Sequence, residues 1–94
     1  MRRYEIVLTE TAKKRLLSVP EKHREELISK LKQLAIAPVT LSEKAPSPPY
    51  PPGFQVFKVF VKDDRRHLYS VLFNYASNEV QLVVAIIGHV EYAD

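Results

Sequence analysis

The residues best suited to chemistry near the end of the chain are a histidine and a tyrosine. His89 follows the apolar run Ile86-Ile87-Gly88, and Tyr92 comes three positions later. An imidazole titrates near neutral pH, whereas a phenol keeps its proton and can donate a hydrogen bond. The pair is suited to acid/base chemistry or to phosphate contacts, although a surface histidine without such a role fits the same pattern.

A second group of candidates lies in a basic segment between residues 58 and 69. Alternation along a strand places Lys58, Phe60 and Lys62 on one side. If the turn spans residues 63–65, Lys62 lies opposite Arg66 and the cations share one face; a two-residue turn reverses this relation. Such a face suits RNA, because phosphates need positive charge and unstacked bases stack on aromatic rings. The alternative is the solvated outer face of a half-exposed sheet.

The other two histidines are less informative. His67 shares a strand face with Tyr69, Val71 and Phe73, and we expect it at the edge of the core. His23 falls within a helix, where we expect it to be solvated. The three histidines have neither helical nor paired spacing, and the chain has no cysteine. We therefore predict no metal site and no cofactor.

The overall composition is that of one globular domain. The 94 residues fit a single domain spanning 1–94, with 46% hydrophobic and 27% charged residues. The absence of cysteine excludes disulfides and a thiol nucleophile. A net charge of +3 makes a nucleic-acid or acidic-protein partner plausible, although many small domains carry this charge without one. With no signal peptide and no apolar stretch near the ~20 residues that span a bilayer, we expect a cytoplasmic protein that does not insert into a membrane.

Helical and strand periodicities predict the elements that would position these residues. Residues 4–8 form a strand with Tyr4, Ile6 and Leu8 on one face. Thr9 or Thr11 then caps a first helix, whose inward positions are Ala12, Leu16 and Val19. A capping box from Ser18 to Glu21 predicts a second helix over residues 19–37, which Pro38 ends. Its buried stripe is Leu27, Ile28, Leu31, Leu34 and Ala35.

A proline-rich connector at 38–53 separates the helices from the remaining strands. Pro46, Pro48, Pro49, Pro51 and Pro52 favour an extended, polyproline-like path. Three strands follow at residues 54–62, 66–75 and 80–87. The element order is β-α-α-β-β-β, which predicts an α+β domain with a mainly antiparallel sheet and two helices packed on one face.

In combination, these features resemble the RelE/ParE superfamily of toxins from type II toxin–antitoxin systems. The similar segments are Tyr4-Glu5-Ile6-Val7-Leu8-Thr9 with Ala12, Leu17-Ser18-Val19-Pro20 with Arg24, Ile28, Leu31, Leu34 and Pro38, the strand Arg66-His67-Leu68-Tyr69, and the closing Ile87-Gly88-His89 with Tyr92. The resemblance covers nearly the whole chain. It implies a microbial RNase-like fold with a curved sheet.

The resemblance also implies a function and a set of site residues. RelE-type members are endoribonucleases that cleave mRNA on the ribosome and inhibit translation, and each is held inactive by a cognate antitoxin. Carried over to this chain, Arg66 would stabilise the transition state, His89 would transfer a proton and Tyr92 would position or stack on RNA. By location alone, the candidate RNA-binding residues are Lys58, Phe60, Lys62 and Arg65. Cleavage through the 2′-hydroxyl requires no metal or other cofactor.

Two alternative functions stay open. ParE-type members share the fold but act on DNA gyrase, and a degenerate member would only bind its antitoxin. This chain has Val90 where the family often has an arginine after the histidine. It also has Asp63 and Asp64 in place of the turn glycine of relatives, and these carboxylates would repel phosphate.

Overall fold

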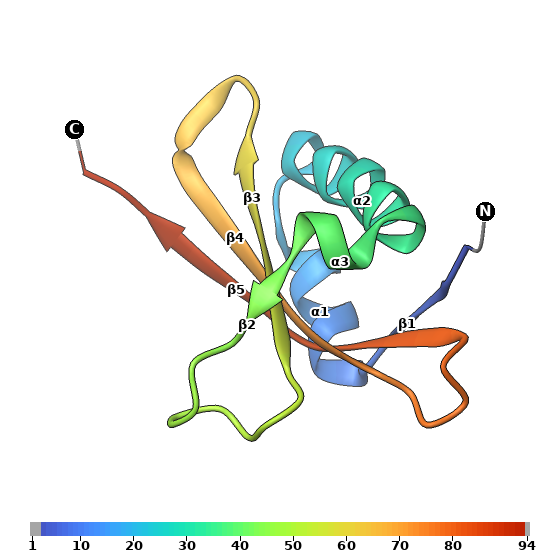
Figure 1. The fold of residues 1–94 in the computed structure, drawn as a ribbon. Coiled ribbons are helices and arrows are strands. Elements are labelled where there is room, and N and C mark those ends of the chain that lie inside the picture. The colour runs from blue at the N-terminus through green and yellow to red at the C-terminus, as the bar shows by residue number, and fades with distance from the viewer. Residues whose placement is uncertain (1–2, 94) are drawn as a thin grey trace.

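The computed structural model describes residues 3–93. In chain order the elements are β1 (Glu5–Leu8), α1 (Glu10–Ser18), α2 (Glu21–Ile36), α3 (Pro38–Leu41), β2 (Glu43–Lys44), β3 (Gln55–Val61), β4 (Asp64–Tyr75) and β5 (Gln81–Glu91), as Figure 1 shows. The predicted order β-α-α-β-β-β is present, with one short helix and one short strand added inside the connector. The prediction of an α+β domain is confirmed. None of the helices in this part of the chain is long and apolar enough to cross a membrane.

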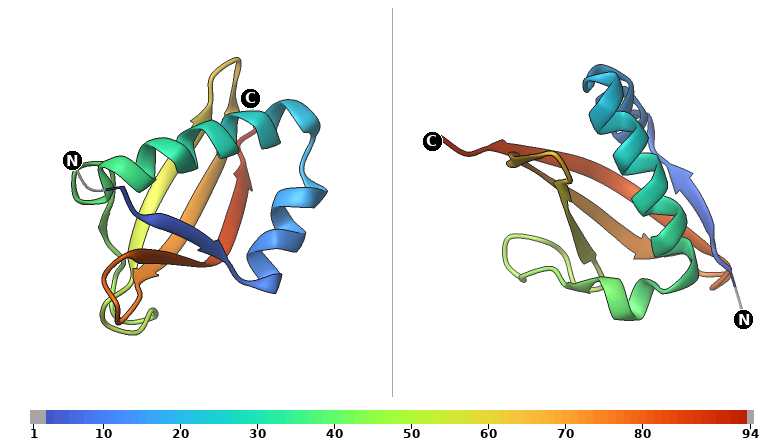
Figure 2. Two further views of the ribbon diagram at one scale, coloured as in Figure 1. Left: turned by 90° about the vertical axis from the view of Figure 1, so that its right-hand side faces the viewer. Right: turned by 90° about the horizontal axis from the view of Figure 1, so that it is seen from above.

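The strands form one mixed sheet in the order β1-β5-β4-β3-β2. β1 runs parallel to β5, and every other neighbouring pair is antiparallel. The first strand of the chain therefore lies beside the last one. The helices α1 and α2 cover one face of this sheet (Figure 2), as the alternation of apolar residues predicts. Beside the opposite face, Pro46 and Tyr50 of the connector line a pocket together with Leu72 and Ile86.

The first helix begins as predicted and is tied to the sheet. Thr9 is its N-cap, and the Thr9 hydroxyl accepts a hydrogen bond of 3.2 Å from the amide of Ala12. The same hydroxyl donates to the carbonyl of Ala85 on β5 at 2.7 Å. One side chain thus caps α1 and fixes it against β5.

The predicted capping box at the start of the second helix is wrong. The hydroxyl of Ser18 donates to the carbonyl of Arg15 at 2.8 Å, so it belongs to the end of α1. Val19 and Pro20 have extended backbone angles, and α2 starts at Glu21 without a side-chain cap. The two helices are separated by this extended pair, which places Ser18 too early in the chain to cap α2.

The core between helices and sheet follows most of the predicted pattern. It contains the predicted Ala12, Leu16, Leu27, Leu31 and Leu34 from the helices and Val19 from the segment between them, and Ala35 is also buried. Tyr4, Ile6 and Leu8 pack against this core from the first strand, as predicted. Ile28 is the exception: it is 38% exposed, because α2 turns its 27–31–34 face to the sheet and leaves Ile28 at the edge of an apolar groove.

The proline-rich connector is not one extended segment. Pro38 occupies the first turn of α3, where a missing amide hydrogen costs nothing, so it both ends α2 and starts the next helix. After β2 the chain makes turns at residues 47–49 and 52–53. Gly53 has a φ of +96°, a backbone conformation that glycine adopts without strain. The prediction of a polyproline-like path through 38–53 is therefore wrong.

The last two strands extend further than predicted, and this extension forms the site described below. β4 begins at Asp64, and β5 continues to Glu91. His67 pairs with Glu91, and Tyr69 pairs with His89. Each strand end is stabilised by its neighbour, an effect that local residue preferences do not reveal.

Candidate active site

All three histidines of the chain meet at the end of the sheet where the β3–β4 hairpin lies. His23 comes from the first turns of α2, His67 from β4 and His89 from β5. The ring centroids of His23 and His67 are 4.6 Å apart, and those of His67 and His89 are 5.0 Å apart with nearly parallel planes. The spacing of the histidines in the sequence did not indicate this grouping, because strand pairing and helix packing bring together residues that are far apart in the chain.

Two short hydrogen bonds join these rings to each other and to a buried tyrosine. Nδ1 of His67 lies 2.8 Å from Nε2 of His89. Nδ1 of His23 lies 2.7 Å from the hydroxyl of Tyr69. The ring of His89 also stacks on Tyr69, with centroids 4.6 Å apart and planes 17° from parallel. We call His23, His67, Tyr69 and His89 the histidine cluster.

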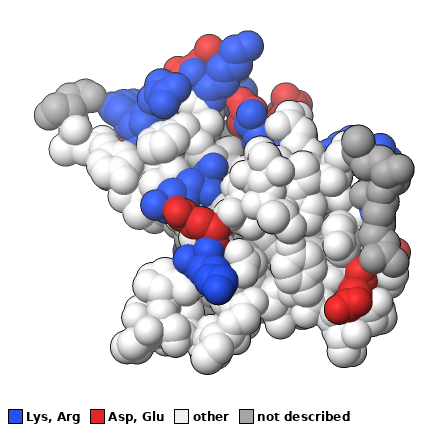
Figure 3. Space-filling model, viewed as in Figure 1, with Lys and Arg blue, Asp and Glu red and all other residues white. Residues whose placement is uncertain are grey.

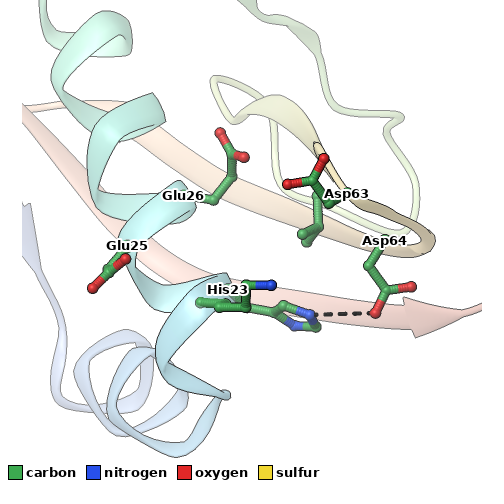
Figure 4. Close-up of a pocket in the computed structure, with 7 residues that line it drawn as sticks. His23, Glu25, Glu26, Asp63 and Asp64 are labelled. Carbon is green, nitrogen blue, oxygen red and sulfur yellow. Dashed lines mark ion pairs between the residues drawn. The ribbon is translucent and has the colours of Figure 1, made fainter.

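Asp64, the first residue of β4, faces the histidine cluster. Its Oδ2 lies 3.3 Å from Nε2 of His67 and 3.6 Å from Nε2 of His23. Figure 4 shows His23 on α2 and Asp64 on the hairpin pointing toward one another. The other carboxylate oxygen, Oδ1, lies 3.5 Å from Nε of Arg66. Asp64 thus connects an arginine to two histidines.

The expectation that His23 is solvated is wrong, since the residue is only 7% exposed. Its position explains the burial: His23, Leu27 and Leu31 follow one another at intervals of four residues, so they share the face of α2 that packs on the sheet. The buried stripe extended by one turn toward the N-terminus would have identified His23. His67 lies at the edge of the core as expected, with 14% of its side chain exposed.

Packing and nearby charge shift the acid/base properties of two cluster members. Partial desolvation lowers the pKa of His89 below its usual value, and His67 and Arg15 lower it further. Burial raises the pKa of Tyr69, an effect that Arg15 opposes and Asp64 reinforces. At neutral pH, His89 is therefore a neutral imidazole that can accept a proton, and Tyr69 keeps its hydroxyl hydrogen.

Sequence reasoning missed Arg15 on α1. Its charge acts on both His89 and Tyr69, and Arg15 lines a shallow pocket together with Lys14 and Ile86. Arg15 lies off the line of inward-facing positions Ala12, Leu16 and Val19, so apolar periodicity does not single it out. The available signal was a basic residue next to the inward-facing Leu16 of an amphipathic helix, which indicates a cation close to the sheet.

The predicted catalytic residues Arg66, His89 and Tyr92 all lie at this end of the sheet. The amide of Tyr92 donates to the carbonyl of Arg66 at 2.7 Å, which places the two residues side by side. The Arg66 side chain is 51% exposed, and Tyr92 is 49% exposed. Arg66 contacts the histidine cluster through Asp64. The structure thus brings these three residues together, while their roles stay predictions.

The predicted register of the basic hairpin is half right. Lys58 pairs with Ser70 and Phe60 with Leu68, as expected for the longer turn. Val61 then pairs with Asp64 across an irregularity, so the turn contains only residues 62 and 63. Phe60 pairs with Leu68 and the next residue, Val61, pairs with Asp64, so residues 65–67 have no partner on β3. These three extra residues of β4 form a bulge. Lys62 therefore does not lie opposite Arg66.

The side chains of Arg65 and Lys58, two of the four candidate RNA-binding residues, make different contacts. The guanidinium of Arg65 lies over the ring of Phe60, 5.3 Å from its centroid. Lys58 instead reaches toward β2, where its Nζ lies 3.8 Å from a carboxylate oxygen of Glu43. The amide of Lys62 donates to the carboxylate of Glu26 at 3.3 Å. Figure 3 shows charges of both signs over the hairpin and a second small group over β2.

Comparison with solved structures identifies the fold. The RelBE2 toxin–antitoxin complex from Mycobacterium tuberculosis matches with a TM-score of 0.72 at 17% identity, covering 93% of this chain and 98% of that one. The isolated Escherichia coli RelE toxin matches with a TM-score of 0.67 at 18% identity, covering 97% and 88%. The archaeal RelE–RelB complex from Pyrococcus horikoshii matches with a TM-score of 0.62 at 15% identity, covering 90% and 92%.

Sequence comparison is less sensitive for this chain: neither family models nor curated proteins give a match. The similarity to the solved structures nevertheless extends over nine-tenths of the chain or more. It agrees with the resemblance predicted from the order of strands, helices and closing residues. The chain therefore has the fold of the RelE toxins.

Proposed function

We propose that this chain is the toxin of a type II toxin–antitoxin system and that it cleaves mRNA on the ribosome. The observation that carries the proposal is the hydrogen-bonded pair of His67 and His89, held between the carboxylate of Asp64 and the ring of Tyr69. The RelE fold of the chain supports the same assignment, since similar structures are toxins and toxin–antitoxin complexes.

The pair is arranged for proton transfer by His89. Asp64 favours the tautomer of His67 that carries its hydrogen on Nε2, because the carboxylate lies next to that nitrogen. Nδ1 of His67 then accepts a hydrogen bond from Nε2 of His89. In this arrangement Nδ1 of His89 has a lone pair available for a proton. The lowered pKa of His89 keeps this lone pair unprotonated at neutral pH.

The proposed reaction is transfer of the RNA 2′-oxygen onto the adjacent phosphate. His89 takes the proton of the 2′-hydroxyl, the 2′-oxygen forms a bond to phosphorus, and the bond between phosphorus and the 5′-oxygen breaks. The leaving oxygen takes a proton from water. The products are a 2′,3′-cyclic phosphate and a 5′-hydroxyl.

Two arginines are placed to stabilise the additional negative charge of the phosphorane-like transition state. Arg66 is half exposed beside Asp64, and the positive charge of Arg15 already acts on the His89 ring. Arg65 and Phe60 offer a stacked cation and aromatic ring to a neighbouring base. Tyr92, next to Arg66, is suited to position the strand.

An apolar groove on the helix side supports an antitoxin partner. It has a volume of about 700 Å³ and runs between α2 and β1. Its apolar lining residues include Ile6, Leu8, Leu16, Ile28, Leu31 and Ile36. Ile28 and Ile36 are both more than one-third exposed, and Lys32 lies at the rim. An amphipathic helix with acidic flanks would bury these side chains and pair with the cation.

The acidic hairpin supports a second candidate, a toxin that acts on DNA gyrase without cleaving RNA. Asp63 and Asp64 lie beside the histidine cluster and would repel an approaching phosphate. A gyrase-acting toxin does not need to bind a phosphate there. This candidate predicts intact mRNA, inhibited supercoiling and an SOS response after induction.

Induced expression followed by mapping of mRNA ends tests the proposal. We expect growth arrest, loss of translation and new 5′ ends within coding regions. His89→Ala should abolish both the arrest and the new ends while the protein still accumulates. Unaffected growth and translation would refute the toxin function, whereas growth arrest with intact mRNA and an SOS response would favour action on gyrase.

A further inference from the structure

Two of the three histidines and Asp64 also form a constellation that the proposed cleavage reaction does not require. One ligand atom from each of His23, Asp64 and His67 lies within 4.8 Å of those of the other two. His23 comes from α2, Asp64 is the first residue of β4, and His67 lies three residues further along the same strand. We propose that they form a binding site for a divalent transition-metal ion, with zinc as the preferred ion.

The two separations between the Asp64 oxygen and the histidine nitrogens match those between the ligand atoms of a zinc ion. Tetrahedral zinc with bonds of about 2.0–2.2 Å to nitrogen and oxygen holds its ligand atoms roughly 3.3–3.6 Å apart. Oδ2 of Asp64 lies 3.3 Å from Nε2 of His67 and 3.6 Å from Nε2 of His23. Both separations exceed the range of about 2.7–3.2 Å that most N–H···O hydrogen bonds occupy.

Each of the three ligands is already oriented by a neighbour, as in protein metal sites. A metal-binding histidine usually donates a hydrogen bond from the N–H of its second ring nitrogen to a nearby acceptor. Nδ1 of His23 is 2.7 Å from the Tyr69 hydroxyl, and Nδ1 of His67 is 2.8 Å from Nε2 of His89. Both Nε2 atoms are therefore directed toward Asp64, whose other oxygen faces Arg66 at 3.5 Å.

Access and charge at the site favour a cation. A pocket of about 420 Å³ opens beside His23 and Asp64, between α2 and the hairpin (Figure 4). Its lining also contains three other carboxylates, Glu25, Glu26 and Asp63, and one cation, Lys22. This excess of carboxylates attracts metal ions, and the open side leaves room for a water molecule as the fourth ligand.

The choice of metal follows from the ligand set. Two imidazoles and one carboxylate suit zinc and its neighbours among the transition metals, whereas magnesium and calcium prefer sites made of oxygen atoms. Copper(II) binds nitrogen ligands more tightly than zinc but prefers square-planar geometry, whereas the spacing of Asp64 from the two imidazoles suits tetrahedral zinc. We therefore expect zinc to bind, cobalt(II) to substitute for it and magnesium not to compete.

Metal binding would also change the direction of the hydrogen bond between His67 and His89. A metal on Nε2 of His67 requires the ring hydrogen on Nδ1, so His67 would donate to His89. His89 would then carry its own hydrogen on Nδ1 and lose the lone pair of a general base. This consequence, inhibition of cleavage by zinc, rests on the proposed function; the metal site itself does not.

The site is tested by binding of zinc and cobalt(II) to the full chain after removal of metal with a chelator. Calorimetry should show one zinc ion bound per chain, and zinc should raise the melting temperature because it binds the folded state. Cobalt(II) should give the intense visible absorption of a tetrahedral complex. RNA is absent from these measurements, so their outcome is independent of whether the chain cleaves RNA.

Matched variants locate the ligands. Asp64→Asn and His67→Gln should lose zinc binding and the cobalt bands. Asp63→Asn removes a carboxylate from the pocket wall but no ligand, so it should keep one zinc ion per chain and the cobalt bands, with at most a small loss of affinity. Tyr69→Phe should weaken zinc binding roughly 10- to 100-fold, as expected for a residue that orients a ligand. Circular dichroism of each metal-free variant verifies its fold. Absence of zinc binding by the unaltered chain, or equal loss in Asp63→Asn and Asp64→Asn, would overturn the proposal.

Discussion

The two faces of the sheet differ most at the end where the β3–β4 hairpin lies. On the helix side, Val71 and Phe73 of β4 are fully buried. Tyr69 and His67 lie on the same face of β4, closer to the hairpin. On the opposite side, Phe60 is 42% exposed under the guanidinium of Arg65. One face thus carries titratable groups next to the buried core, and the other carries a cation and a ring that are exposed to solvent.

In the nuclease that we propose, this difference would separate two tasks. Proton transfer needs groups whose pKa and tautomer are fixed by packing, and such control is available only near the covered face. Binding a flexible single strand needs charge and stacking surfaces that solvent can reach. We therefore expect substitutions on the helix side to change the rate of cleavage or the stability, and substitutions on the open side to change the affinity for RNA.

The largest effect should come from His89→Ala on the helix side. Loss of the general base should lower the rate of cleavage on ribosomes by about 10²- to 10⁴-fold. The dissociation constant for RNA should change little, because the stacking and charged groups of the open side remain. Single-turnover cleavage and a binding titration measure the two quantities separately. A variant that binds RNA much more weakly but cleaves at the original rate would break the distinction between the faces.

A smaller effect is expected for Tyr69→Phe, which keeps the ring and removes the hydroxyl. Tyr69 is fully buried, and its hydroxyl lies 2.7 Å from Nδ1 of His23. Leaving a buried polar atom without its partner costs about 1–3 kcal/mol, so the free energy of unfolding should fall by this amount. Urea unfolding measures the change, and Tyr92→Phe on the exposed strand end is the matched control. Equal stability of the two variants would show that the covered face is not tightly packed there.

On the open side, Phe60→Ala should weaken RNA binding by about tenfold, at the lower end of the range for one stacked base. Stability should change little, since the ring is 42% exposed. Fluorescence anisotropy with a short single-stranded RNA measures the affinity. A large loss of stability without loss of affinity would assign Phe60 to the core instead.

The smallest effect should come from Lys58→Ala. Its ion pair with Glu43 joins two exposed side chains at 3.8 Å, and such pairs contribute between zero and about 1 kcal/mol. If Lys58 contacts a phosphate, the salt dependence of RNA binding should fall by about 0.7 in the log–log slope. An unchanged slope would remove Lys58 from the RNA-binding residues and leave it a role only beside β2.

The covered half of the sheet was predictable from sequence because periodicity reports burial. Leu27, Leu31 and Leu34 at helical spacing, and Tyr4, Ile6 and Leu8 at strand spacing, correctly indicated which faces meet. The Thr9 cap was equally readable, because it depends on residues a few positions apart.

The histidine cluster was only partly predictable, because its contacts join residues far apart in the chain. His89 stood out through its place after a strand, but its contact with His67 depends on the extension of both strands and on a bulge. His23 and Arg15 belong to helices whose orientation on the sheet is set by packing. Asp64 was interpreted as a turn residue that repels phosphate; the structure also places it against two histidines.

The chemistry of the RNA ends tests the central claim most directly. Programmed ribosomes are incubated with the purified chain, and the cleaved mRNA is analysed for its terminal groups. Removal of the 2′-hydroxyl proton by His89, with attack of the 2′-oxygen on the adjacent phosphate, predicts 2′,3′-cyclic phosphates and 5′-hydroxyl ends, and their absence with His89→Ala. Intact mRNA, or fragments that carry 5′-phosphates, would contradict this account.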